Sequence, residues 1–184
     1  MGLLPVRNAA SKPVILKRLF GHRKSDPSEA LYAAIVAAAR QERFYAEWQV
    51  PDNLDGRFDM LVLHMFLTLD RLRHFGAESN VLRQALTDRF FAEMDAALRE
   101  VGVGDISVGK KVRKMAEAFF GRVAAYTQGM DQGETALGEA LARNVYAECD
   151  SSHAIDMACW TLKAKHVLST QDYSSLSEGQ VRFE

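Results

Sequence analysis

Length, composition and charge bound the class of this protein. The chain has 184 residues, 48% of them hydrophobic and 26% charged, which suits one globular domain with a single core. Its formal net charge of -1 excludes a typical nucleic-acid-binding domain, which carries a clear basic excess, and its two cysteines exclude a disulfide framework. No apolar run reaches the roughly 18 residues that a membrane-spanning helix needs.

The residue types favour helices throughout the chain. There are only 4 prolines, and long stretches rich in alanine, leucine and arginine contain none. Such stretches favour α-helix, whereas a sheet would show several short β-branched runs at regular spacing, and we find no such runs. We therefore predict an all-α fold, a single-domain bundle of about six helices with a central hydrophobic helix.

The first 25 residues differ in charge from the rest of the chain. All of their charged side chains are basic, so the remaining residues have a net charge of about -7 by subtraction. These basic residues are Arg7, Lys12, Lys17, Arg18, Arg23 and Lys24. We predict a flexible basic arm over residues 1–25 and a helical domain over residues 26–184.

Three interpretations of the arm stay open: a disordered solubilising tail, a removable targeting presequence and an anchor on a membrane surface. Apolar residues between Val14 and Phe20 are interleaved with basic ones, as in helices that lie on anionic lipid. A presequence would also be rich in arginine and poor in acid, and a start assigned too far upstream would make residues 1–13 artificial. For the anchor, the predicted membrane-surface residues are Lys17, Arg18, Phe20, Arg23 and Lys24.

The first two long helices have clear starts and stops. The run Asp26–Glu29 combines an N-cap aspartate, a proline at the first helical position and a capping-box glutamate. Pro51 follows the end of this first helix. The segment Phe58–Phe75 is apolar on nearly every side, which is typical of a central buried helix, and Gly76 ends it.

Helical spacing of apolar residues continues through the second half of the chain. Gly102 and Gly104 interrupt this spacing, and the helical pattern after the second of these helices is weaker. In chain order we predict a helix from residue 80 to 101, a glycine elbow at 102–104, a helix from 105 to 126, a turn at 128–133, a weaker helix near 137–145, a last helix after 150–152 and irregular chain from 169.

The elbow is crowded with charge but has no nucleophile, metal cluster or phosphate-binding loop. A charged, non-catalytic elbow on a helical scaffold indicates a surface that holds another molecule, although a plain solvated face would have the same composition. Lysines near a helix start oppose the helix dipole, which favours a use for them in pairing with acids. The predicted client-binding or partner-binding residues are Arg99, Asp105, Lys110, Lys111, Lys114 and Arg122.

The histidines and cysteines do not point to catalysis or to a metal. His64 lies in the most apolar helix, where a core histidine bonded to a neighbour is favoured over a haem ligand. Cys149, His153 and Cys159 lack an evident fourth ligand for zinc. We expect a small buried cysteine at each of the two positions, no metal, no cofactor and no catalytic residue.

Three blocks of residues occur together in the order found in a known family. Two of them are continuous, Phe58–Arg73 and Leu176–Phe183. The remaining block comprises Asp88, Asp95, Leu98–Asp105, Val108, Lys110, Lys111, Glu117, Phe119, Gly121, Arg122 and Tyr126. From about residue 31 to its end, the chain resembles the ubiquinol–cytochrome c chaperones, which are assembly factors for cytochrome b of the respiratory bc1 complex.

The resemblance implies a non-enzymatic assembly chaperone that binds cytochrome b or an early assembly intermediate. In mitochondrial members it also implies a small partner protein. The implied location is cytoplasmic and peripheral to the inner membrane, on the matrix side in a eukaryote. The basic arm adds an anionic membrane surface as an expected partner. We expect no nucleic-acid partner. The competing class is a helical haem-binding or haem-degrading enzyme, which needs a proximal histidine near the first helix, where His22 lies.

Overall fold

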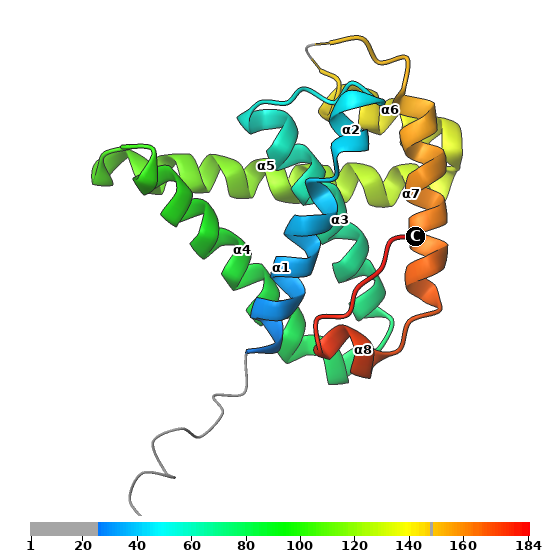
Figure 1. Cartoon of the computed structure of the whole chain (residues 1–184), viewed down its shortest axis with the longest axis horizontal. Coiled ribbons are helices and arrows are strands. Elements are labelled where there is room, and N and C mark those ends of the chain that lie inside the picture. Colours follow the sequence, from blue (N-terminus) through cyan, green and yellow to red (C-terminus); the bar gives the residue numbers. More distant parts are fainter. Residues whose placement is uncertain (1–25, 148) are drawn as a thin grey trace, which may run out of the picture.

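Helices dominate residues 26–147 and 149–184, the part of the chain that the computed structural model describes (Figure 1). The predicted basic arm lies outside the described residues. In chain order the elements are α1 (Pro27–Ala39), α2 (Glu42–Ala46), α3 (Leu54–Arg73), the 3-10 helix η2 (Gly76–Ser79), α4 (Asn80–Glu100), α5 (Asp105–Gln132), α6 (Glu134–Asn144), α7 (Ala154–Ser169) and α8 (Tyr173–Ser177). Apart from α2 and α8, with 5 residues each, the α-helices have 11 to 28 residues, which confirms the predicted all-α bundle of about six helices.

Helix α3 is the predicted central helix. It begins at Leu54, a few residues earlier than expected, because the Asn53 side chain caps it by accepting a hydrogen bond from the Gly56 amide at 2.9 Å. More than half of its 20 residues are buried, and α1, α4, α5 and α7 all pack against it. Figure 1 shows α3 passing behind α1, with α5 crossing it and α7 alongside. The core is therefore organised around one helix.

Helix α1 starts as the sequence predicts. Asp26 accepts a hydrogen bond from the Ser28 amide at 3.0 Å, and Pro27 occupies the first helical position. The same carboxylate lies 3.2 Å from Arg89 on α4. The cap thus also links the start of α1 to α4.

Helix α5 is longer than predicted. It continues through the residues expected to form a turn, and only Gly133, with a φ of 103°, ends it. A Cβ at Gly129 would lie 2.8 Å from the Cα of Leu137, so glycine at this position allows α6 to approach closely. The predicted turn at 128–133 is wrong because this glycine serves packing between helices.

The chain after Thr170, predicted to be irregular, forms α8 and a strap across the core. Gln171 is buried and holds the strap: its Oε1 accepts from the Arg182 amide at 2.9 Å, and its Nε2 donates to the Arg182 carbonyl at 2.7 Å. Phe183 packs on His64, with ring centroids 4.7 Å apart. These contacts close the side of the core that α1 and α7 leave open.

Two ionisable groups of α3 are buried. The Nδ1–H of His64 donates to the Met60 carbonyl at 2.7 Å, which confirms the predicted core histidine, and burial lowers the pKa of His64 to about 4. Asp59 is 4% exposed and pairs with Arg122 of α5, with Oδ1 and Nη2 2.6 Å apart. Burial raises the pKa of Asp59 to about 7, although the charge of Arg122 opposes the rise.

These groups give opposite pH dependences of stability. Between about pH 4 and 6.5 the unfolded chain binds a proton at His64 that the fold does not, so stability rises with pH. Between pH 3.8 and about 7 the fold keeps a proton on Asp59 that the unfolded chain releases, so stability falls as pH rises. The two contributions therefore oppose each other over most of this window.

We predict that Asp59→Asn removes only the falling contribution. The free energy of unfolding of the variant, relative to the parent, should then rise as the pH increases from 4 to 7. The rise is on the order of 3 kcal/mol, because each pKa unit corresponds to about 1.36 kcal/mol. Urea titrations at several pH values measure it. Parallel profiles for parent and variant would contradict the raised pKa.

Candidate functional site

Helices α4 and α5 form a V whose point is the predicted elbow (Figure 1). After α4 ends at Glu100, Gly102 adopts a φ of 82°, which few residues other than glycine tolerate. This turn lets the Val103 amide donate to the Leu98 carbonyl at 3.0 Å, as in a Schellman motif. The backbone itself therefore defines the angle at which α5 leaves α4.

Three of the six predicted binding residues form ion pairs within the chain. Arg99 lies between two acids: its Nε is 2.6 Å from Asp95, and its Nη1 contacts the carboxylate of Asp105 across the elbow. Arg122 is paired with the buried Asp59. The Arg122–Asp59 pair is buried and ties α5 to α3, whereas the pairs of Arg99 are exposed and add little to stability.

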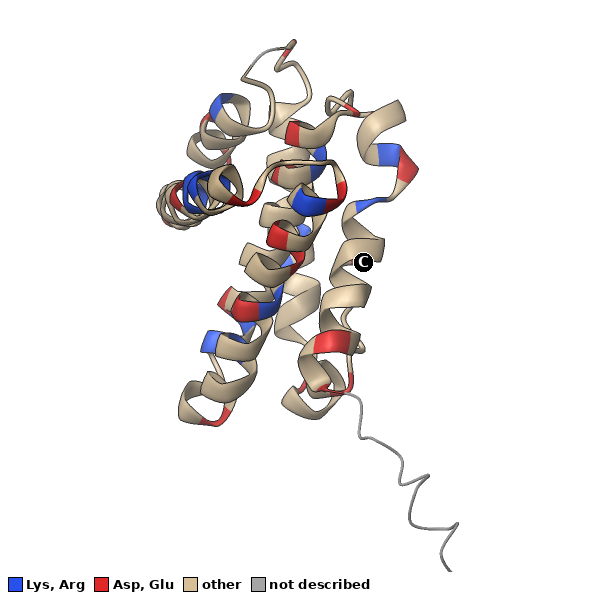
Figure 2. Cartoon of the chain, turned by 90° about the vertical axis from the view of Figure 1, so that its left-hand side faces the viewer, with Lys and Arg blue, Asp and Glu red and all other residues tan. Residues whose placement is uncertain are grey.

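The other three predicted residues, Lys110, Lys111 and Lys114, are exposed on the first turns of α5. None of them forms an ion pair with another described residue, whereas Asp95, Asp105 and Glu117 are paired with arginines. Figure 2 shows this basic cluster at the start of α5, which is viewed nearly end-on. The lysine charges remain available to an acidic group from outside the chain.

An apolar groove of about 500 Å³ lies beside these lysines. It is bounded by the end of α1, the start of α3, the second half of α4 and the first half of α5. Its volume is in the range of ligand-binding clefts. The apolar residues that line it are Val36, Ala39, Leu54, Phe58, Leu61, Met94, Ala97, Leu98, Val101, Met115 and Ala118.

The rim of this groove is basic. Lys111 and Lys114 on α5 and Arg40 at the end of α1 make no ion pair with a described residue, whereas Arg57 is paired with Asp52 at 2.7 Å. Asp55 is the only acid among the lining residues. A groove of this kind suits an apolar segment that carries acidic residues at its edges.

Apolar side chains reach the solvent at the groove's mouth. Leu54 is 68% exposed and Val101 is 72% exposed; exposed apolar side chains that gather at a groove are a common feature of interaction surfaces. Met94 and Met115 have the helical spacing of core positions but are only half-buried, because the arms of the V diverge from the body, a feature that no local pattern encodes.

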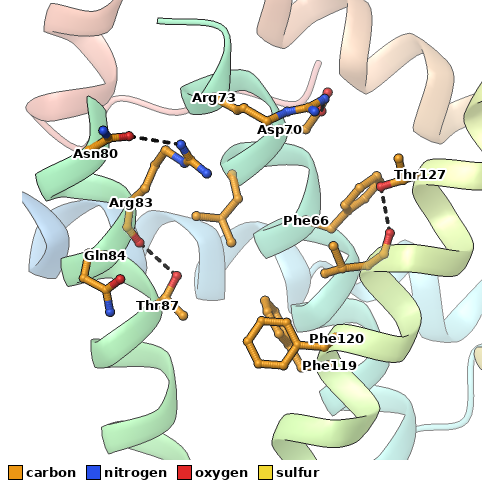
Figure 3. Close-up of a pocket in the computed structure, with 12 residues that line it drawn as sticks. Phe66, Asp70, Arg73, Asn80, Arg83, Gln84, Thr87, Phe119, Phe120 and Thr127 are labelled. Atoms are coloured by element: carbon orange, nitrogen blue, oxygen red, sulfur yellow. Dashed lines mark hydrogen bonds and ion pairs between the residues drawn. The ribbon is translucent and has the colours of Figure 1, made fainter. Parts of the chain in front are cut away.

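A second concavity, the Arg83 pocket, lies on the other half of the V (Figure 3). Its volume is about 430 Å³, and it lies between the second half of α3, the first half of α4 and the second half of α5. Asp70 and Arg73, three residues apart on α3, form an ion pair in its lining at 2.7 Å. The lining residues are Phe66, Leu69, Asp70, Arg73, Asn80, Arg83, Gln84, Thr87, Phe119, Phe120, Val123 and Thr127.

The cysteines differ from expectation. Cys159 is half-buried but Cys149 is exposed, because α6 ends at Asn144 and the chain then loops out, so the predicted burial is wrong for Cys149. Within the described residues, no group of three or more His, Cys, Asp or Glu side chains is placed to hold a metal. None of the described helices combines the length and apolarity needed to cross a membrane.

Comparisons with known proteins agree with this architecture. The sequence model of the family described as ubiquinol-cytochrome C chaperone matches residues 46–183. The crystal structure of the Cbp3 homolog from Brucella abortus superposes on this chain with a TM-score of 0.77 at 39% sequence identity. That similarity covers 92% of this chain and 97% of the Brucella chain.

Animal relatives are more distant. Ubiquinol-cytochrome-c reductase complex assembly factor 1 of Xenopus laevis is 21% identical over 148 residues, or 79% of this chain and 74% of the relative. The Mus musculus and Homo sapiens proteins of that name are each 20% identical over 128 residues, and the match spans only 43% of their length. Because the family match covers most of the sequence and the Brucella fold matches nearly end to end, this chain belongs to the ubiquinol-cytochrome c chaperone family.

Proposed function

We propose that this protein is a non-enzymatic chaperone that binds cytochrome b, or an early intermediate containing it, during assembly of the bc1 complex. Family membership and the naming of its relatives as assembly factors support the assembly role. The observation that carries the binding role is the apolar groove with its basic rim. This groove, formed by four helices next to the elbow, supports the proposed binding role.

The chemistry of the groove fits a membrane-protein client. Cytochrome b is an integral membrane protein, so its segments expose apolar side chains before they enter the bilayer. The groove wall can cover such a segment, and its methionines adapt to varied shapes because their side chains are unbranched and flexible. Lys111 and Lys114 can pair with acidic residues beside the apolar segment, which would fix its orientation.

We further propose that the protein works in the cytoplasm, or in the mitochondrial matrix of a eukaryote, at the surface of the inner membrane. Its basic arm would hold it there reversibly, since the residues between Val14 and Lys24 mix apolar and basic side chains. These residues lie outside the described part of the chain. A small partner protein, as in mitochondrial members of the family, would bind the same complex.

The alternative of a haem enzyme gains no support from the described residues. The ring of His64 is packed against Phe44, Trp160 and Phe183, and its Nε2 is shielded from solvent. A haem could reach this nitrogen only if the core opened. His22, the other candidate ligand, lies outside the described residues.

Deleting the gene for this protein should lower the amount of assembled bc1 complex and its b-type haem signal. Transcription of the complex's subunits should not change, because a chaperone acts after translation. Haem difference spectra, blue-native gels and transcript levels measure the three quantities. Normal quinol–cytochrome c reductase activity in a clean deletion strain without a second copy would refute the assembly role.

Leu54→Asp should weaken capture of cytochrome b by a tagged form of this protein. The substitution places a carboxylate in the groove wall, where an apolar client segment would have to desolvate it. Val81→Asp is the matched control, because Val81 is 81% exposed in the first turn of α4 and lies outside the groove. Both folds should be nearly unaffected, within about 0.5 kcal/mol, since both side chains are exposed.

Co-purification of cytochrome b with each tagged variant measures this effect, and thermal unfolding checks the folds. Equal capture by the two variants would show that the groove does not hold the client.

In the same assay, changing Lys110, Lys111 and Lys114 to glutamate should reduce capture without unfolding the protein. Unfolding of that triple variant would show that the lysines are structural.

The basic arm should bind anionic vesicles in a salt-sensitive manner. We expect the full-length protein to co-sediment with such vesicles at low salt, to dissociate at high salt and to ignore neutral vesicles. A chain that lacks residues 1–24 should stay in the supernatant while keeping its helical circular dichroism. If the shortened chain sediments as well as the full one, the arm is not the anchor.

A further inference from the structure

The Arg83 pocket contains a cation without a counter-ion. The Arg83 guanidinium points from α4 into the pocket (Figure 3). Its Nη1 donates a long hydrogen bond of 3.3 Å to Asn80 Oδ1, and its Nε is shielded from solvent without a partner among the described residues. No described carboxylate forms an ion pair with it. A partly buried guanidinium in this state is stabilised when an anion binds to it.

The acid of the pocket cannot neutralise Arg83. Asp70 is the only acid among the lining residues, and it already serves two cations. Its Oδ1 lies 2.7 Å from Arg73, and its Oδ2 lies 3.7 Å from Lys165 of α7. The charge of Arg83 therefore stays uncompensated, and the lining of the pocket is net positive.

The other polar groups of the pocket are largely engaged. Thr87 and Thr127 donate their hydroxyl protons to backbone carbonyls of their own helices, each at 2.8 Å. The side-chain amide of Gln84 donates to Asp88 at 2.8 Å. Arg83 is thus the strongest donor that the pocket offers to a ligand, which favours a ligand with one anionic group.

The opposite wall of the pocket is aromatic and aliphatic. Phe119 is buried, whereas Phe120 is 57% exposed beside it, with ring centroids 5.2 Å apart. Phe66, Leu69 and Val123 complete this wall. An exposed phenylalanine next to a net positive hollow gives one half of the pocket an affinity for hydrocarbon and the other half an affinity for an anion.

We propose that the Arg83 pocket binds an anionic amphiphile, with its carboxylate or phosphate group on Arg83 and its hydrocarbon chain along Phe119 and Phe120. A volume of about 430 Å³ accommodates one head group and a short length of chain. The ligand can be a free amphiphile or a lipid at the edge of a bilayer, since both present the same chemistry. The inference goes beyond client binding, because the pocket lies on a different half of the V from the groove.

Isothermal titration of the full chain with octyl phosphate tests the proposal. The parent should bind octyl phosphate at least about tenfold more tightly than octanol or inorganic phosphate, because each of those lacks one half of the recognised structure. Arg83→Gln should weaken octyl phosphate binding by about tenfold, and Phe120→Gln by roughly fivefold. Arg113→Gln, on an exposed part of α5 outside both concavities, is the control and should stay within about twofold of the parent.

Vesicles that contain phosphatidic acid distinguish the two sources of ligand. If Arg83→Gln lowers vesicle binding relative to the parent, with the arm intact in both, the ligand is a lipid head group. If only octyl phosphate binding falls, the ligand is a free amphiphile; either result supports the pocket. Equal octyl phosphate affinities of the parent and Arg83→Gln would overturn the proposal, as would equal affinities of the parent for octyl phosphate and octanol. Should Arg83→Gln fail to fold, parent-like binding by Phe120→Gln would overturn it instead.

Discussion

The contact between Asp59 of α3 and Arg122 of α5 fixes the point at which α5 crosses the central helix. Sliding α5 along α3 would separate the two groups and leave Asp59 buried without a partner, which is costly whether its carboxyl group is ionised or protonated. One turn further on, the fully buried Tyr126 packs on Phe66 with ring centroids 5.7 Å apart. The crossing is thereby held on two consecutive turns of α5.

Both concavities follow from this single crossing. Arg122 lines the groove on one side of it, whereas Val123, the next residue, lines the Arg83 pocket on the other. The first half of α5 must leave the body to meet α4 at the elbow, because the second half is committed to α3 and α6. An arm that leaves the body exposes part of its apolar stripe. The groove and the Arg83 pocket are therefore consequences of how α5 is anchored. If they bind partners as proposed, surfaces formed in advance lower the entropic cost of binding.

Features with local signals could be predicted from the sequence. The start of α1 was predictable because Asp26 and Pro27 act within one turn, and the elbow because Gly102 needs a positive φ. The continuation of α5 was not, since Gly129 reads as a turn residue unless its neighbour on α6 is known. The groove was missed for the same reason: Met94 and Met115 have the spacing of core residues, and their incomplete burial depends on where the arms diverge. The exposure of the three lysines was expected, but their role with a client stays a prediction.

Many of the residues that carry the family resemblance hold the scaffold. Arg99 and Asp105 pair across the elbow, and Phe183 packs in the strap over His64. These contacts connect the resemblance to the scaffold of the V, and they do not identify a molecule that the V binds. The groove wall is divided: Phe58, Leu61, Leu98 and Val101 belong to the matching blocks, whereas Leu54, Met94 and Met115 lie outside them. The wall positions outside the blocks can change while the crossing, the elbow and the strap are kept, because exposed side chains such as Leu54 contribute little to stability. If the groove holds the client segment, as we propose, substitutions at these wall positions and at the basic rim should alter which segment is held before they alter the fold.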